Sequence, residues 1–166
     1  MTVILYWAQA AISQKISNFS TSNQLDLKKI IVFSRDEQKQ YYMSKEKEFD
    51  PIKHVEKKLG LFGEGDVTIA CWEPGQVSPN HCHPEATEIY FCFEGGGIMR
   101  TLDDEIEVVK GGLVVHPRGE LHEYTNGPER TILFRVRYGD SMTTRTKNWP
   151  TNPEWKATAV DLEYFA

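Results

Sequence analysis

The sequence has few cysteines, and none of them form the C-x-x-C pair of zinc ribbons and thioredoxin-like proteins. There are three, Cys71, Cys82 and Cys92, an odd number that fits free thiols in a reducing compartment. The sequence also lacks a block of Lys or Arg, and its formal net charge is −5. Because phosphate groups bind to cationic surfaces, we expect no nucleic-acid partner and no binding to an anionic membrane.

A long hydrophobic run is also missing. The apolar stretch at residues 3–12 is shorter than the roughly 20 residues that cross a bilayer, and no Lys or Arg precedes it. A secretory signal carries its positive charge in front of the apolar run. We therefore expect a cytoplasmic protein without a membrane span. Its first segment packs as a strand, pairs with another subunit, frays, or is an overextended start.

The rest of the composition is that of an ordinary globular protein of 166 residues, 40% hydrophobic and 26% charged. This length suits one domain with a core of its own. From residue 66 onward, short runs rich in β-branched and aromatic residues alternate with Gly and Pro. They predict strands at 66–72, 88–93, 98–101, 106–109, 113–116 and 131–138, with a hairpin turn at Asp103-Asp104. Many short strands at this spacing predict an all-β sandwich or barrel.

The two ends of the chain have other patterns. Residues 30–33 have the apolar pattern of a short strand, 36–45 that of a surface helix, and 51–58 that of a helical turn stopped by Gly60. Near the other end, Asn152 is placed to cap a short helix with Pro153 at its first position. We therefore expect an N-terminal extension (1–55) packing on the barrel, the barrel itself (56–140), and a C-terminal tail with a short helix (141–166).

Three of the five histidines lie close together within the expected barrel. His81 and His83 are two residues apart, so that on a strand both imidazoles lie on one face. A turn through residues 84–87 can return Glu88 to that face, and His122 follows a turn at 117–119. Imidazole nitrogens and carboxylate oxygens suit divalent first-row metals. Four such ligands leave two positions of an octahedron open, as a catalytic site requires.

These residues stand in two motifs that resemble those of the cupin superfamily. The first is Gly75-x5-His81-x-His83-x4-Glu88-x6-Gly95, and the second is Gly111-x5-Pro117-x-Gly119-x2-His122-x3-Asn126. The 15 residues between the motifs resemble the short spacing of small microbial cupins. The resemblance implies a double-stranded β-helix, or jelly-roll, barrel. It also implies that His81, His83, Glu88 and His122 hold a divalent transition metal (Fe, Mn, Zn, Ni or Co). The motif glycines fit barrel corners that need unusual backbone angles.

Other candidate residues have both a functional and an ordinary interpretation. Tyr90 and Tyr124 share the parity of Glu88 and His122, so they either bind substrate or fill the barrel as core aromatics. His116 either supports the metal ligands from behind or is an ordinary strand residue, and we expect the latter. His54 lies in a stretch rich in Lys and Glu, and we expect it to be a solvated surface residue.

Parity also assigns faces to the cysteines and to two arginines. Cys82 is expected to point away from the metal into the core, and Cys92 either faces the cavity or is a buried, inert thiol. Arg135 and Arg137 alternate with apolar residues on the last strand, and the usual arrangement places such arginines outside. The reverse arrangement would place them inside the barrel and favour a carboxylate substrate.

The expected function is that of a metal-dependent enzyme acting on a small molecule. With Fe(II), the site suits a dioxygenase acting on a small organic anion. With Zn, Mn, Ni or Co, it suits an isomerase, lyase or decarboxylase that uses the metal as a Lewis acid. The alternative from another class is a non-catalytic small-molecule binding protein, since the fold alone does not fix the chemistry. Because one-barrel cupins often dimerise, we also expect a homodimer.

Overall fold

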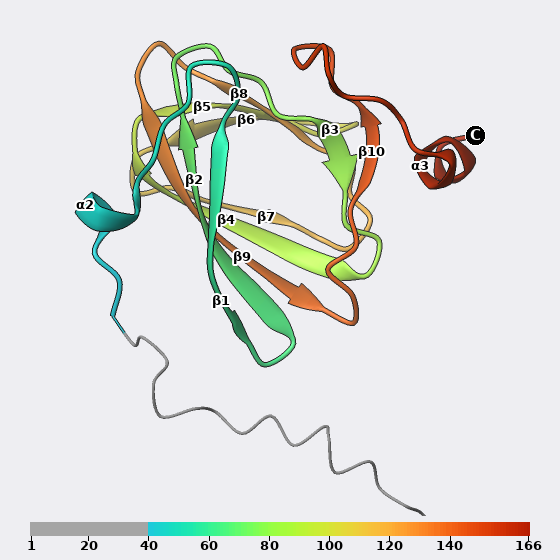
Figure 1. Cartoon of the computed structure of the whole chain (residues 1–166), viewed down its shortest axis with the longest axis horizontal. Coiled ribbons are helices and arrows are strands. Elements are labelled where there is room, and N and C mark those ends of the chain that lie inside the picture. Colours follow the sequence, from blue (N-terminus) through green and yellow to red (C-terminus); the bar gives the residue numbers. More distant parts are fainter. Residues whose placement is uncertain (1–39) are drawn as a thin grey trace, which may run out of the picture. The chain divides into compact units, whose positions relative to one another are not determined.

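The computed structural model describes residues 40–166, and the expectations for residues 3–12 and 30–33 lie outside the described residues. Within this part the chain is built mainly of short strands (Figure 1). The elements are α2 Met43–Glu46, β1 Val55–Phe62, β2 Gly65–Trp72, β3 Asn80–Cys82, β4 Ala86–Glu94, β5 Gly96–Arg100, β6 Glu105–Val109, β7 Leu113–His116, β8 Glu123–Asn126, β9 Thr131–Gly139, β10 Arg145–Asn148 and α3 Ala159–Tyr164.

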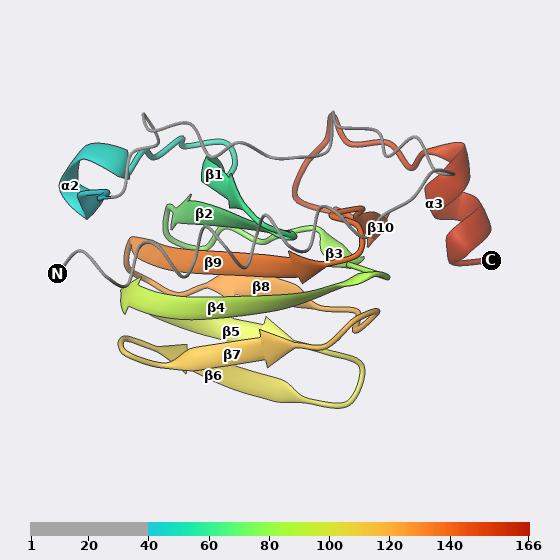
Figure 2. The same ribbon diagram turned by 90° about the horizontal axis from the view of Figure 1, so that it is seen from below.

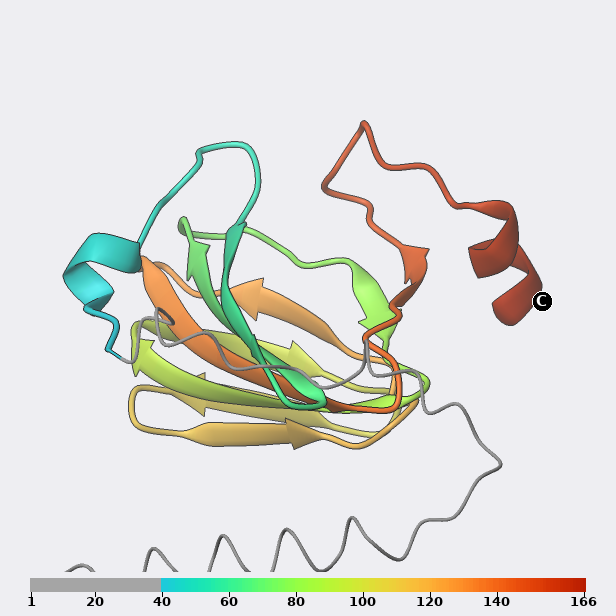
Figure 3. The same cartoon turned by 60° about the horizontal axis from the view of Figure 1, so that its bottom comes forward.

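The strands pair antiparallel in three sheets. The largest has the order β1-β2-β9-β4-β7, the second has the order β6-β5-β8, and β10 pairs with β3. Figure 2 shows the five-stranded sheet in front, from β1 to β7, with β8, β5 and β6 behind it. In Figure 3, β1 and β2 lie on one side of the barrel and β3 and β10 on the other. This arrangement is the predicted all-β jelly-roll barrel.

The strands expected between residues 66 and 138 are confirmed, and so is the hairpin at Asp103-Asp104, where Arg100 pairs with Glu105. The helical turn predicted at 51–58 is wrong, because Val55–Phe62 forms β1 and pairs antiparallel with β2. Its charged residues stand on the edge strand of the sheet, where solvent reaches the side chains. Charged residues are therefore as compatible with this edge strand as with a surface helix, and they did not distinguish the two. Of the helix predicted at 36–45, the described part contains α2 only.

The short helix predicted to begin after Asn152 is also wrong. The side-chain oxygen of Asn152 accepts a hydrogen bond from the Glu154 amide at 3.1 Å and closes a turn. The helix of the tail is α3, which begins with a capping box: Thr158 Oγ1 accepts from the Asp161 amide, and Asp161 Oδ2 accepts from the Thr158 amide, each at 3.2 Å. Asp161 Oδ1 also accepts from the Thr146 amide in β10 (3.1 Å), and Figure 1 shows α3 beyond that strand.

The three-part division of the chain stays a prediction. Residues 145–148, which belong to the expected tail, contribute β10 and pair with β3 of the barrel.

In its middle rows, across β2, β9, β4 and β7, the five-stranded sheet has charged side chains on its inner face and apolar ones on its outer face. On the inner face, directly opposed residues form the buried rows Asp66–Arg137–Glu88–His116 and Thr68–Arg135–Tyr90–Val114. On the outer face, the matching rows are Val67–Val136–Ile89–Val115 and Ile69–Phe134–Phe91–Leu113. The remaining barrel interior is apolar and holds Trp72, Met99, Tyr124 and Leu133.

The three cysteines are buried and unpaired. Burial raises the pKa of each thiol, so that all three stay protonated and unreactive near neutral pH. Cys82 is buried as expected, and Cys92 packs in the barrel core beside Tyr90 and Leu133.

The motif glycines turn the chain at the barrel corners. Gly75, Gly95, Gly111 and Gly119 have φ of 73°, 72°, 83° and 77°, which is the left-handed region that favours glycine. At Gly95 there is also no space, because a Cβ would collide with Thr131 Oγ1 and with the Arg130 carbonyl. The first motif therefore requires glycine there for two separate reasons.

Candidate metal centre

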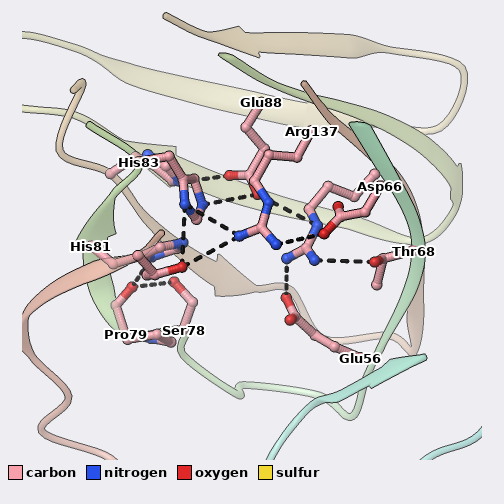
Figure 4. Close-up of polar contacts among 12 residues, drawn as sticks. Glu56, Asp66, Thr68, Ser78, Pro79, His81, His83, Glu88 and Arg137 are labelled. Carbon is pink, nitrogen blue, oxygen red and sulfur yellow. Dashed lines mark hydrogen bonds and ion pairs between the residues drawn. The ribbon is translucent and has the colours of Figure 1, made fainter. Parts of the chain in front are cut away.

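Four ligand-type side chains meet where β3, β4 and β8 come together. His81 lies on β3 with His83 directly after it, Glu88 lies on β4, and His122 stands just before β8. The amide of His81 bonds to the carbonyl of His122 and the reverse bond also forms, each at 2.9 Å, which holds the two motifs side by side. All four side chains are buried, and their ligand atoms lie within 4.8 Å of one another. Figure 4 shows His83 and Glu88 turned toward each other beside His81.

Glu88 is at the centre of this cluster. Its Oε2 is 2.9 Å from His122 Nε2, and its Oε1 is 3.1 Å from His83 Nε2. Burial alone would raise the pKa of Glu88, but the contacts with His122 and His83 outweigh it and hold the pKa well below its usual range. The carboxylate is therefore ionised at neutral pH and supplies a negative charge at the bottom of the site.

Backbone carbonyls orient two of the imidazoles. His81 Nδ1 is 2.8 Å from the Pro79 carbonyl, and His122 Nδ1 is 2.9 Å from the Glu120 carbonyl. A carbonyl only accepts, so Nδ1 of each of these rings carries a proton. His122 Nε2 faces Glu88 Oε2, which also only accepts, so this contact requires a proton or a cation between the two atoms. His83 Nδ1 lies 3.3 Å from the Thr143 carbonyl, which only accepts, and 3.3 Å from Arg137 Nη1, which only donates, so these contacts do not fix the tautomer of His83. Burial, together with the nearby His122, holds the pKa of His81 well below its usual range, so this ring is neutral.

The arrangement fits the metal that the motifs imply. Lone pairs that face a carboxylate at about 3 Å repel it unless a cation or a proton stands between them. Within the described residues, His83 Nε2 and Glu88 Oε1 are buried without any hydrogen-bond partner. Buried polar atoms are rarely left unsatisfied, and three imidazoles with one carboxylate form a donor set for a divalent transition metal. The predicted ligands thus lie together in a site that can hold such an ion.

His116 is more than the ordinary strand residue that the sequence suggested. Its ring lies flat against that of His122, with centroids 4.0 Å apart and planes 6° from parallel. Its Nδ1 is 2.6 Å from Glu120 Oε2, and the backbone carbonyl of the same Glu120 orients His122. His116 therefore supports the ligand that comes from the second motif. It reaches that place because it lies directly opposite Glu88 in the sheet.

A cavity of about 370 Å³ adjoins the cluster. Its polar wall contains the three ligand histidines together with Lys58, Arg135 and Arg137. Its apolar wall contains both tyrosines that the sequence analysis singled out, Tyr90 and Tyr124, beside two tryptophans and two methionines. The Tyr124 hydroxyl donates to Asn126 Oδ1 at 3.0 Å, and burial raises the pKa of Tyr90 well above its usual value. The role of Tyr90 and Tyr124 in substrate binding stays a prediction.

Arg135 and Arg137 point into the barrel, so the expectation that they lie outside is wrong. They are only 4% and 7% exposed, whereas Tyr138 on the same strand is 48% exposed. Their burial is possible because each guanidinium has a carboxylate partner: Arg137 Nη2 donates to Asp66 Oδ2 at 2.6 Å, and Arg135 Nη1 donates to Glu56 Oε1 at 2.7 Å. Figure 4 shows Arg137 between Glu88 and Asp66.

His54 is not the solvated residue that its neighbours in sequence suggested. Its side chain is only 8% exposed, and its ring stacks on Trp72 with centroids 4.0 Å apart. Burial lowers the pKa of His54, so that it is neutral at pH 7. The cavity wall also includes Trp149, whose Nε1 donates to the Val77 carbonyl at 3.0 Å. The chain just after β10 therefore closes one side of the cavity.

Sequence reasoning missed three charged residues of this site. Lys58 and Glu56 lie on β1, in the stretch expected to be helical, and Asp66 begins the pattern of β2. The sequence did contain one indication of this site: Asp66 and Thr68 are two residues apart, which places them on the same face of a strand. Nothing in the sequence linked that face to Arg135 and Arg137.

The fold and the site define a β-barrel that carries a buried set of three histidines and one glutamate. The pattern of the Cupin domain family matches residues 68–147, which contain all four of these side chains. Solved structures of cupin and double-stranded β-helix proteins share the fold. Residues 68–147 therefore form a cupin domain.

Similar proteins agree with this assignment. Germin-like protein subfamily 2 member 4 of Arabidopsis thaliana is 39% identical over 80 residues, which are 44% of this chain and 36% of that protein. The chain thus spans about a third of the length of the curated relatives it matches. A conserved protein with a double-stranded β-helix domain from Klebsiella pneumoniae has a TM-score of 0.63 at 16% identity, over 68% of this chain and 100% of that one. A DMSP lyase from Ruegeria pomeroyi DSS-3 has a TM-score of 0.53 at 21% identity, over 63% and 54%. Both structures share the fold.

In residues 40–166, neither helix has the length and apolar character needed to cross a membrane.

Proposed function

We propose that this cupin is a metal-dependent enzyme that acts on a small organic anion. The observation that supports the proposal is the position of two buried arginines, Arg135 and Arg137, in the wall of the same cavity as the three ligand histidines. Guanidinium groups bind carboxylates, and a metal with open positions binds and polarises oxygen donors. One cavity therefore combines a reactive centre with groups that attract an anion.

The charges of the cavity support this choice of substrate. Three cations, Lys58, Arg135 and Arg137, are balanced by three carboxylates, Glu56, Asp66 and Glu88. A bound divalent ion would leave an excess of two positive charges in a buried space. Because a buried charge without a partner is costly, an anionic substrate bound there is favoured.

The residues of the chain have distinct roles in this proposal. His81, His83, Glu88 and His122 would hold the ion, which would supply a Lewis acid or, as ferrous iron, a centre that activates dioxygen. The positive charges of Arg135 and Arg137 attract the anion. Tyr90 keeps its proton because burial raises the pKa of its hydroxyl, so it donates a hydrogen bond rather than acting as a base. The apolar wall around Trp72 excludes water from the bound substrate.

Among the reactions open to such a site, we propose oxygen chemistry with Fe(II), that is, a dioxygenase. Its support is the ligand chemistry: four protein donors leave two octahedral positions, enough for dioxygen and the substrate together. Lewis-acid isomerase, lyase or decarboxylase chemistry would need a protein group to move a proton. Glu88 is committed to the cluster and Tyr90 stays protonated, so these two residues do not supply such a base.

The test begins with metal analysis of the purified protein, followed by loading with Fe(II), Mn, Ni, Co or Zn under anaerobic conditions. Oxygen uptake is then measured with a panel of 1,3-diketone, phenolic and keto-acid anions. We expect uptake with iron only, and its loss in Glu88→Gln, which keeps the size of the side chain but removes its charge. Metal-dependent turnover without oxygen uptake would overturn the dioxygenase assignment. If the protein retains an unchanged ligand and shows no turnover with any of these metals, the proposal that it is an enzyme is overturned.

A further inference from the structure

The two buried arginines of the cavity differ in how their charges are neutralised. Arg137 is paired with Asp66, which is completely buried and also lies 3.2 Å from Lys58 Nζ. Arg135 is paired with Glu56, whose side chain is 38% exposed and comes from the edge strand β1. Both pairs are short, at 2.6 and 2.7 Å. The first is closed to solvent, whereas the second has one member at the rim of the cavity.

The other contacts of Arg135 do not involve Nη1, so a different carboxylate can replace Glu56 at this atom. Its Nη2 donates to the neutral hydroxyl of Thr68 at 3.1 Å, and its Nε lies 3.4 Å from Glu88 Oε1. Of the two carboxylates near Arg135, Glu56 is therefore the one in direct hydrogen-bond contact. The nearby carboxylates, Glu56 first among them, outweigh the effect of burial and raise the pKa of Arg135, so the guanidinium is always charged.

We propose that Arg135 binds the carboxylate of the substrate. Before the substrate binds, Glu56 pairs with Arg135, and the substrate carboxylate then displaces it. Exchange of one carboxylate for another keeps the buried guanidinium paired throughout, so no unpaired charge is left inside. Glu56 can turn to water because it is already partly exposed. Asp66 cannot do so without leaving Arg137 unpaired in the interior. The reaction that follows rests on the proposed function, but the exchange itself does not.

The rest of the cavity indicates what is attached to that carboxylate. Beyond Arg135 the wall consists of Trp72, Tyr90, Met99 and Tyr124, and His54 lies flat on Trp72. Flat aromatic walls favour a planar apolar body. An aromatic carboxylate therefore fits the chemistry of the cavity, and benzoate is the simplest probe, with neutral benzamide as its matched control.

The test is calorimetric titration of benzoate and benzamide into the full chain at pH 7 and constant ionic strength. In Glu56→Gln we expect the Kd for benzoate to fall about tenfold, because the competing charge is gone, and the Kd for benzamide to stay the same. Glu73→Gln is the control, since Glu73 forms a similar pair with Arg130, 2.7 Å long, outside the cavity lining. The double variant Glu56→Gln/Arg135→Gln, which leaves no unpaired charge, should lose the gain and bind benzoate at least tenfold more weakly than Glu56→Gln.

Unchanged benzoate affinity in Glu56→Gln would overturn the exchange. Equal tightening of benzamide would overturn it too, because the effect would then come from space rather than charge. Each titration is run on chelator-treated and on zinc-loaded protein. Failure of the site to take up metal ends the proposed function but leaves the metal-free titration as a valid test of Arg135. If the protein takes up metal normally but Glu56→Gln does not change benzoate affinity, only the proposed exchange of carboxylates is overturned.

A separate observation concerns the outer face of the five-stranded sheet. Toward β2, residues Met43 and Phe49 pack on Ile69 and Phe134. Toward β4 and β7 the apolar rows are open in the described part of the chain, and Phe93, Leu113, Val115 and Tyr138 are 39%, 59%, 49% and 48% exposed. The exposed rows on β9, β4 and β7 contain no charged residue, and two charged residues flank them: Lys57 of β1 lies opposite Ile69, and Glu94 of β4 lies opposite Ile132.

We propose that this face pairs with the same face of a second copy of the chain. An uncharged apolar patch is self-complementary, so two copies meet about a two-fold axis without like-charge repulsion. The three strands β9, β4 and β7, about 4.8 Å apart and about 20 Å long, present about 300 Å² of flat sheet, and the side chains that project from it, with the surface around them, supply the rest of the roughly 800 Å² per partner of a stable interface. Sheets packed face to face are a common solution for such surfaces.

The test is the mass of the full chain in solution by light scattering. We expect a dimer, and a monomer for Leu113→Lys and Val115→Lys, whose positions on the edge strand β7 tolerate a polar side chain in the monomer. Leu102→Lys, at a 76% exposed site in the hairpin turn, is the control and should stay dimeric. A monomeric wild type, or a dimer that both β7 variants leave intact, would overturn the assignment of this face.

Discussion

The imidazole of His116 lies parallel to that of His122 at a centroid distance of 4.0 Å, and the same residue, Glu120, contacts both rings. The stack fixes the plane of His122, and the carbonyl of Glu120 fixes its tautomer. Both effects keep Nε2 aimed at Glu88 before any ion binds. Groups that orient a metal ligand in this way typically contribute 10–100-fold to metal affinity.

The first prediction follows from this stack. His116→Ala removes the ring that supports His122, and we expect metal affinity to fall about tenfold. His116→Phe keeps a flat ring but loses the contact with Glu120, so it should retain most of the affinity. Competition titrations against a chromogenic chelator measure both values. Equal losses in the two variants would show that the hydrogen bond to Glu120, rather than the stack, is what matters.

The second prediction concerns removal of the metal. A ligand present at about 100 times its Kd stabilises the folded state by about 2.7 kcal/mol, so a chelator should lower the Tm by roughly 5–10 °C. Glu88→Gln removes the negative ligand, and its Tm should not respond to the chelator. Calorimetric scans of both proteins, with and without chelator, give the comparison. A wild-type Tm that is insensitive to both chelator and added metal would contradict a bound ion.

The third prediction concerns the closed ion pair of Asp66 with Arg137. Burial alone would raise the pKa of Asp66, but the hydrogen bond from Arg137 outweighs it and lowers the pKa below its ordinary value. Asp66→Asn leaves Arg137 buried without its carboxylate, which should reduce the free energy of unfolding by about 3 kcal/mol at pH 7.

The sign of the pH dependence follows from the direction of that shift. Because the folded-state pKa of Asp66 lies below its unfolded value of about 3.9, the ionised carboxylate stabilises the fold above pH 4. That contribution is lost as the pH falls through the folded-state pKa. The difference between wild type and Asp66→Asn in urea denaturation should therefore be constant from pH 7 to about 4 and shrink below that. A difference that grew on acidification would contradict the pair.

The metal cluster could be predicted from sequence because its geometry is mostly local. His81 and His83 share a face by strand parity, and a short turn brings Glu88 beside them. His122 was assigned through the resemblance of the second motif, and the structure shows its physical basis in the backbone ladder between His81 and His122. The strands between residues 66 and 138 were predictable for a similar reason, since alternation and Gly or Pro turns are local signals.

The faces of the last strand were not predictable in the same way. Alternation separates Arg135 and Arg137 from Phe134 and Val136, but it does not say which set faces inward. The usual rule places charge outside, and here the partners Glu56 and Asp66 reverse it. Those partners come from strands far away in the sequence, and one of them lay in a stretch predicted to be helical. The position of His54 was missed for the same reason, because its burial depends on Trp72.

The last prediction tests why the first motif needs glycine at its end. Gly95 and Gly111 have similar positive φ values, 72° and 83°, so replacement by alanine strains the backbone at both, by about 1 kcal/mol. Only at Gly95 does the new Cβ meet Thr131 Oγ1 and the Arg130 carbonyl, whereas at Gly111 nothing lies within 4 Å. Gly95→Ala should therefore lower the free energy of unfolding by roughly 3 kcal/mol or more, against about 1 kcal/mol for Gly111→Ala. Urea denaturation of the two variants measures the difference. Equal losses would mean that β9 moves aside at Thr131, and that the motif keeps this glycine for its backbone angle alone.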